Sequence, residues 1–254
     1  MMPWVLLRGL SREARHWGAF PDRLGKALDG APVICLDFPG NGERFREHSP
    51  TSVEAMADDC HARLLELGVS RPCRVLAMSL GAMVAVAWAQ RHPADLAGAV
   101  LINTSLRPFS PVYQRLRPHN YRRIVSLLLG RRTDAQIEDD ILAMTSTRGM
   151  LPQERAALLS DWVRWRAERP ASAGNVIRQL IAAARFRAPL QAPSVPCLIL
   201  GSRGDKLVDS RCSQHLAAAW GVPLVLHPWA GHDLPLDDPE WIIQQSKIFL
   251  SETK

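Results

Sequence analysis

Short, largely apolar runs alternate with longer helix-compatible stretches along this chain, and no other feature constrains its fold as strongly. The runs lie at residues 4–7, 33–36, 74–77, 98–102, 197–200 and 224–226. Apolar runs without polar alternation are typical of strands that are buried on both faces. Strands that alternate with helices favour a parallel sheet. We therefore expect an α/β fold with a mainly parallel sheet of about six strands and helices on both of its faces.

The segment between residues 108 and 190 breaks this alternation because it carries no strand signal. Four helices are predicted there, at residues 111–129, 134–146, 153–168 and 171–186, with Gly and Pro residues between them. The prediction is therefore a core in two parts, residues 1–107 and 191–254, with an all-helical cap inserted at residues 108–190.

The turn Ala77-Met78-Ser79-Leu80-Gly81 joins the third predicted strand to an almost wholly apolar helix. A serine on such a sharp turn projects its hydroxyl above the edge of the sheet, where the N–H groups at the start of the helix also point. The turn requires small neighbours, and Ala77 and Gly81 meet that requirement. We predict that Ser79 is a nucleophile.

A serine hydroxyl is a poor nucleophile unless a base removes its proton, and His232 is the candidate for that base. It lies in a loop after the last predicted strand and before the final helix. Asp205, which follows the strand at 197–200 and a Gly-containing turn, is the predicted carboxylate that orients the imidazole. The competing position, after the fourth strand, holds Asn103, which supplies no carboxylate. The predicted catalytic residues are therefore Ser79, Asp205 and His232, in that order along the chain.

With these motifs the sequence resembles the α/β-hydrolase superfamily over nearly its whole length. It is similar to the small, helical-capped carboxylesterases and C–C bond hydrolases, a group that includes pimeloyl-ACP methyl ester esterase. The order Ser, Asp, His is that of the α/β-hydrolase fold. The matching segments are Leu6-Leu7-Arg8-Gly9-Leu10, Asp37-Phe38-Pro39-Gly40-Asn41-Gly42, Ala77-Met78-Ser79-Leu80-Gly81, Gly201-Ser202-Arg203-Gly204-Asp205 and Ala230-Gly231-His232.

The resemblance implies an oxyanion hole made by the backbone N–H groups of Leu10 and Leu80. Arg8 stands where the family commonly has a histidine before the glycine. The resemblance also implies a mechanism without a cofactor, and the sequence contains neither a phosphate-binding glycine loop nor a metal-ligand motif.

The predicted cap is strongly basic. Between Arg107 and Arg187 there are fifteen arginines, no lysine and seven acidic residues, a net charge of +8 in a chain whose net charge is +6. Three interpretations stay open: a solvated surface, a docking face for an acidic carrier protein such as acyl carrier protein, or recognition of a carboxylate on a small substrate. Nucleic-acid binding is disfavoured because no recognised motif accompanies the charge.

Large apolar residues of the cap have two interpretations. They line an acyl pocket over Ser79, or they form the cap's own core, which we favour for most of them. The residues in question are Leu128, Ile141, Trp162, Trp165 and Phe186.

The expected activity is hydrolysis of a small-molecule carboxylic ester or thioester through an acyl-Ser79 intermediate. Alternatives on the same residues are acyl transfer and C–C bond hydrolysis, and a third is a ligand-binding protein of this fold without catalysis. The five cysteines form neither a disulfide framework nor a zinc pattern, which favours a cytoplasmic protein. The sequence also contains no apolar run long enough to span a membrane.

Overall fold

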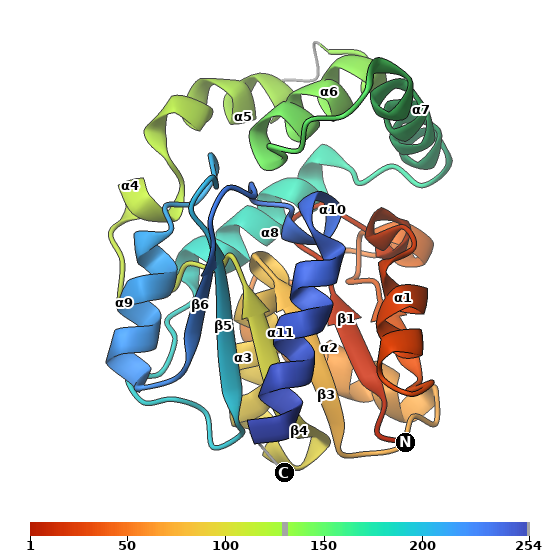
Figure 1. Ribbon diagram of the computed structural model, residues 1–254. Helices are drawn as coiled ribbons and strands as arrows, with labels where there is room; N and C mark the ends of the chain where they lie inside the picture. The colour runs from red at the N-terminus through yellow and green to blue at the C-terminus, as the bar shows by residue number, and fades with distance from the viewer. Residues whose placement is uncertain (129–131, 253–254) are drawn as a thin grey trace.

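The computed structural model describes residues 1–128 and 132–252, with no account of the side chains of residues 127 and 128. Its centre is a single sheet in the order β2-β1-β3-β4-β5-β6, in which every neighbouring pair is parallel (Figure 1). The strands are β1 Trp4–Leu7, β2 Val33–Leu36, β3 Cys73–Met78, β4 Leu96–Ile102, β5 Cys197–Ser202 and β6 Leu224–His227. The predicted fold class, including the number of strands, is confirmed.

Successive side chains of a strand point to opposite faces of the sheet, and each face is buried by its own set of helices. On one face, Val75 and Ala77 of β3 pack with residues of α2 Val53–Glu66, α3 Leu80–Arg91 and α9 Arg211–Trp220. On the other face, Leu76 and Met78 pack with residues of α1 Phe20–Ala27 and α11 Pro239–Glu252. The uninterrupted apolar runs in the sequence result from this burial on both faces.

The helix that follows Ser79 is apolar on all sides because it lies inside the core. Every residue from Leu80 to Ala89 of α3 is buried, and a helix without a polar face is expected only where protein surrounds it. The turn at Ser79 is therefore attached directly to a helix that is fixed by the core around it.

Among the described residues between β4 and β5, five α-helices are present, and Figure 1 shows α5, α6 and α7 above the carboxyl ends of the strands. They are α4 Val112–Arg115, α5 Tyr121–Leu128, α6 Asp134–Thr145, α7 Pro152–Glu168 and α8 Ala173–Arg185. The prediction of one helix at 111–129 was wrong in part, since α4 ends at Arg115 and a short turn at Pro118–Asn120 precedes α5. Pro118 lacks the N–H that a continuous helix needs at this point. Residue 129 of that prediction lies outside the described residues.

The chain after β6 contains the short helix α10 Leu234–Asp237 and then α11, which returns along the sheet. Throughout residues 1–128 and 132–252, we find no helix with both the length and the apolar character that a bilayer crossing requires.

Candidate active site

Ser79 occupies a strained backbone conformation between the end of β3 and the start of α3. Its φ of 54° and ψ of −117° are unusual for a residue with a side chain. Gly81 allows the turn to lie against the neighbouring strand, because a Cβ there would approach the carbonyl oxygens of Leu7 and Arg8 to 2.5 and 2.6 Å. The strand–turn–helix geometry predicted from the sequence is therefore present, and it exposes the hydroxyl at the carboxyl edge of the sheet.

The loop after β1 lies directly against Ser79. A Cβ on Gly9 would be 3.2 Å from the Cβ of Ser79, and Leu10 lines the same two cavities as Ser79. Leu80 is the first residue of α3, so its N–H has no acceptor within the helix. The two backbone segments predicted to form the oxyanion hole thus flank the serine.

Asp205 and His232 meet in the interior at the same edge. The Nδ1 atom of His232 lies 2.7 Å from Oδ2 of Asp205, and each residue is 3% exposed. The second carboxylate oxygen of Asp205 accepts hydrogen bonds from the N–H groups of Leu207 and Val208, at 2.8 and 2.9 Å. Both oxygens of Asp205 are therefore held, which fixes the imidazole and leaves its Nε2 atom for another partner.

Burial by itself lowers the pKa of His232, but the charge of Asp205 and its hydrogen bond outweigh that effect. The pKa of His232 therefore lies above the usual value of 6.5. His232 and Ser79 line one cavity, although the described residues include no hydrogen bond between their side chains. Such contacts are often long before a substrate binds.

Asn103, which supplies no carboxylate, supports the loop that contains His232. Its Nδ2 atom donates to the carbonyl oxygens of Gly231 and His232, at 3.1 and 2.9 Å, and to the hydroxyl of Ser202 at 3.0 Å. The side chain therefore ties the loop of His232 to the ends of β4 and β5.

Arg8 and Asp233 form a buried ion pair beside the site, which the sequence did not reveal. Two N–H groups of Arg8 donate to the two oxygens of Asp233, at 3.1 and 2.7 Å, and Arg8 is 2% exposed. The guanidinium also lies 4.8 Å from the ring centre of Trp17. The pair connects the residue before Gly9 with the residue after His232. The only sequence signal for it was the arginine where relatives commonly have histidine.

A first cavity of about 130 Å³ extends from Ser79 toward the cap. Its apolar lining comes from the core and from three cap helices, α5, α6 and α8, and includes Met78, Ile124, Ile141, Met144, Val176, Leu180 and Leu207. Of the cap residues considered for an acyl pocket, Ile141 lines this cavity. Trp162 is buried under Arg12, Trp165 packs on His16, and Phe186 belongs to the main core. The side chain of Leu128 lies outside the described residues.

A second, larger cavity of about 590 Å³ opens on the other side of Ser79, between the segment 107–116 and α8. Ser79, Leu10, Leu180 and Leu207 line both cavities. A substrate carbonyl at Ser79 would therefore have space for one substituent in each direction.

The cap is joined to the core by a buried charge cluster below the first cavity. Glu138 of α6, 1% exposed, accepts from Arg12 of the core and from Arg166 of α7, each at 2.6 Å. Burial raises the pKa of Glu138, but the guanidiniums of Arg12 and Arg166 lower it by a larger amount. The pKa of Glu138 therefore lies below its usual range. The carboxylate is therefore charged, and it connects α6 with α7 and with the loop after β1.

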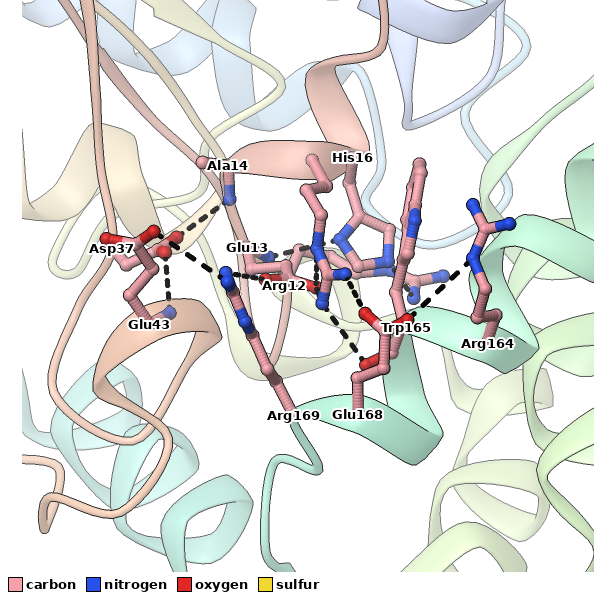
Figure 2. Close-up of polar contacts among 11 residues, drawn as sticks. Arg12, Glu13, Ala14, His16, Asp37, Glu43, Arg164, Trp165, Glu168 and Arg169 are labelled. Atoms are coloured by element: carbon pink, nitrogen blue, oxygen red, sulfur yellow. Dashed lines mark hydrogen bonds and ion pairs between the residues drawn. The ribbon is translucent and has the colours of Figure 1, made fainter.

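Figure 2 shows a second set of contacts at the same junction, where cap residues at the end of α7 meet the loop after β1. Arg169 lies 3.8 Å from a carboxylate oxygen of Glu13, and Arg15 forms an ion pair with Glu168. The nearby imidazole of His16 is kept neutral, since burial and the charge of Arg12 hold its pKa well below 6.5. These contacts orient the cap above the strands.

Three side chains at the opposite edge of the sheet have potential metal-ligand atoms within 4.8 Å of one another, namely His61, His92 and Asp95. Asp95 already accepts from Arg71 at 2.8 Å and from the indole of Trp88 at 2.8 Å, and it contacts His61 at 2.6 Å. These contacts fill the carboxylate, and the group precedes β4 rather than following a strand, away from Ser79. It is therefore not part of the site at Ser79.

Known proteins resemble this chain over most of its length. A model of the "Alpha/beta hydrolase family" matches residues 4–245. Proteins named "Putative carbamate hydrolase RutD" align with it at low identity. That of Pseudomonas savastanoi pv. phaseolicola is 29% identical over 92% of this chain and 88% of its own length. That of Escherichia coli O44:H18 is 26% identical over 93% and 85%.

Solved structures share the fold. A thermophilic esterase from Thermogutta terrifontis superimposes with a TM-score of 0.76 at 24% identity, over 100% of this chain and 90% of that one. The enol-lactonase from Burkholderia xenovorans LB400 reaches a TM-score of 0.79 at 19% identity, over 99% and 92%. At these identities the structures establish the fold alone.

Proposed function

Because the chain belongs to the alpha/beta hydrolase family, we propose that it hydrolyses a carboxylic ester or thioester through an acyl-enzyme intermediate on Ser79. The observation that carries the proposal is the buried contact of His232 Nδ1 with Asp205, 2.7 Å long, beside a cavity that Ser79 shares. A base oriented in this way, next to a strained and accessible serine, is the arrangement that nucleophilic catalysis requires.

In the first step the Ser79 hydroxyl attacks the substrate carbonyl, and His232 takes the hydroxyl proton at Nε2. Asp205 holds the ring and stabilises its positive charge. The negative charge that develops on the carbonyl oxygen is stabilised by the N–H groups of Leu10 and Leu80. The bond from the carbonyl carbon to the alcohol or thiol then breaks, and His232 returns the proton to that leaving group.

In the second step water attacks the acyl-Ser79 carbonyl and His232 takes a proton from the water. The bond to Ser79 breaks, the serine regains its proton, and the carboxylic acid leaves. An alcohol or amine in place of this water would give acyl transfer on the same residues.

Carbamates are a second candidate substrate class, supported by the relatives named as carbamate hydrolases. The same sequence of steps applies to a carbamate carbonyl. A panel containing p-nitrophenyl esters, small thioesters, thioesters on an acidic carrier protein, diones and carbamates separates these possibilities by kcat/KM.

Ser79→Ala tests the proposal directly. The variant is expected to lose p-nitrophenyl ester hydrolysis by about 10⁴–10⁶-fold, because the nucleophile is absent. A fluorophosphonate probe is expected to label the wild-type protein at Ser79, as read by mass spectrometry of the peptide. Ser160→Ala, which removes an exposed serine on α7, is the matched control. Retention of activity in Ser79→Ala, or labelling elsewhere, refutes the proposal.

A further inference from the structure

The second cavity beside Ser79 has three guanidiniums on its wall: Arg107, Arg115 and Arg187, here called the arginine triplet. They come from the segment after β4, which includes α4, and from the segment that follows α8, and these two segments meet at this cavity. No aspartate or glutamate is among the described residues that line it. The wall is therefore positively charged without an internal counterion.

Backbone contacts hold the arginine triplet in place. Arg107 donates to the carbonyl oxygen of Ala184 at 3.1 Å, and Arg115 donates to that of Ala183 at 2.8 Å. The backbones of Arg107 and Arg187 form an isolated parallel bridge. The guanidiniums of Arg107 and Arg115 and the backbone of Arg187 are thus held before any ligand binds, which reduces the entropy lost on binding.

Contacts with the end of α8 do not account for all of the N–H donor groups of the arginine triplet. Basic side chains near a helix C-terminus interact favourably with its last carbonyls, and this explains one N–H group each of Arg107 and Arg115. It leaves Nε of Arg115 buried without any hydrogen-bond partner, and among the described residues it gives the side chain of Arg187 no partner. Donor capacity therefore remains unused.

The other arginines that line a cavity at Ser79 differ in having a counterion, although Nε of Arg8 and Nη2 of Arg12 are also buried without a hydrogen-bond partner. Arg8 is neutralised by Asp233 and Arg12 by Glu138. Within the part of the chain that the structure describes, no member of the arginine triplet forms an ion pair. Burial lowers the pKa of Arg115, and the charge of Arg107 lowers it further. An anion placed between them would remove this repulsion.

We propose that the arginine triplet binds an anionic group of the substrate, a carboxylate or a phosphate, while the scissile carbonyl of the same molecule lies at Ser79. Planar guanidiniums match the oxygen geometry of both groups. The same cavity is also lined by apolar side chains, among them Leu10, Leu116 and Leu180, so we expect the part of the substrate that connects the anion to the carbonyl to be apolar. This inference rests on the proposed function and narrows its substrate class.

Pairs of esters that differ only in the presence of an anionic group test the proposed anion site. Monomethyl adipate against methyl hexanoate places a carboxylate on the acyl side. O-acetyl-4-hydroxybutyrate against butyl acetate places it on the alcohol side, and the acetyl ester of 3-hydroxypropyl phosphate introduces a phosphate there. For at least one pair the wild-type kcat/KM is expected to be about tenfold or more in favour of the anionic ester, since a charge-assisted hydrogen bond contributes that much.

Variants of the triplet decide whether that preference comes from this wall. Arg115→Gln and Arg187→Gln are each expected to reduce the anionic-to-neutral ratio of kcat/KM about tenfold, chiefly through KM. Arg187 is exposed, so its substitution is tolerated even if Arg115→Gln impairs folding. The control is Arg185→Gln, which removes an equal charge from an exposed residue of α8 outside both cavities and should leave the ratio unchanged.

A binding measurement separates this inference from the proposed function. Calorimetric titration of the Ser79→Ala protein should show tighter binding of one of the anionic esters than of its neutral partner, and Arg187→Gln should abolish that difference. Equal binding of both partners, or equal effects of Arg187→Gln and Arg185→Gln, overturns the inference even if neutral esters are hydrolysed. If no ester is hydrolysed and the phosphonate labels nothing, the proposed function fails instead, and the titration still decides the anion site.

Discussion

The core and the cap meet at Ser79, but they hold their charged side chains in different ways. In the core, Asp205 contacts His232 and two backbone N–H groups, and Arg8 pairs with Asp233. In the cap, Glu138 pairs with Arg12 of the core, whereas Arg115 lines the second cavity and has no counterion among the described residues. The difference indicates that core charges maintain geometry, and that the cap contains charge that a ligand can still neutralise.

The largest effect on activity is expected when the carboxylate of Asp205 in the core is removed. Asp205→Asn is expected to lower kcat/KM for a p-nitrophenyl ester by about 10⁴-fold, because the imidazole loses its orientation and its stabilised charge. A residual activity above one tenth of wild type would show that Asp205 does not have this role.

The same variant has a consequence for pH dependence. In the proposed reaction His232 must be neutral to act as the base. The kcat/KM of the wild type should therefore increase with pH, with its midpoint at the pKa of His232, which lies above 6.5. Asp205 is what raises this pKa, so the rise in Asp205→Asn should occur at lower pH. A pH–rate profile of both proteins measures this. An unchanged or upward-shifted midpoint contradicts the assignment.

The connection between the two regions is tested by Glu138→Gln. Loss of the carboxylate leaves the buried guanidinium of Arg12 and the partly buried guanidinium of Arg166 without this counterion. Breaking a buried pair in this way costs about 3–5 kcal/mol. Urea denaturation should show this loss in the free energy of unfolding, and a change below 1 kcal/mol would mean that the cap is held by other contacts.

Gly81, beside Ser79, and Gly149, in the cap, differ in how closely other backbone atoms approach them. In Gly81→Ala the new Cβ would meet two carbonyl oxygens of the neighbouring segment at 2.5 and 2.6 Å, and the turn must shift. We expect a loss of about 1–3 kcal/mol in stability and a fall in kcat of about 10²-fold. Gly149→Ala in the cap is the control, because its Cβ would have no atom within 4 Å and neither quantity should change.

The smallest effect is expected for a cap ion pair that faces solvent. Asp161 pairs with Arg164 at 2.7 Å, with both side chains largely accessible. Asp161→Asn should change the free energy of unfolding by less than about 1 kcal/mol, and less still in high salt. It makes the same chemical change as Asp205→Asn, so unchanged ester hydrolysis in this variant shows that the effect at Asp205 is specific. A large effect here would contradict the division between the two regions.

The turn at Ser79 and the contact between Asp205 and His232 could be predicted because each of these residues lies directly after a strand or in the loop that follows one. Ser79 follows an apolar run and precedes an apolar helix, and Asp205 and His232 follow later strands. The carboxyl ends of parallel strands lie at one edge, so residues that follow such strands are brought together. The contact between Asp205 and His232 is the outcome of that rule.

The supporting residues could not be predicted in the same way. Arg8 and Asp233 are 225 residues apart in the chain, and Arg12 and Glu138 are 126 apart. No spacing rule connects such residues, and the sequence does not distinguish Glu138 from an acidic residue of an exposed helix, because its burial depends on the packing of the cap on the core. The break in the first cap helix depended on Pro118, whose effect the helical pattern concealed.

The sequence by itself determined the strands, the strained turn at Ser79 and the order of the candidate catalytic residues, because steric limits and apolar patterning act within a few residues. Only the tertiary structure decided which arginines are neutralised and which are not. Pairing of charges depends on distances between segments that are remote in the chain, so fifteen similar arginines in the sequence acquired different surroundings only when the cap met the core.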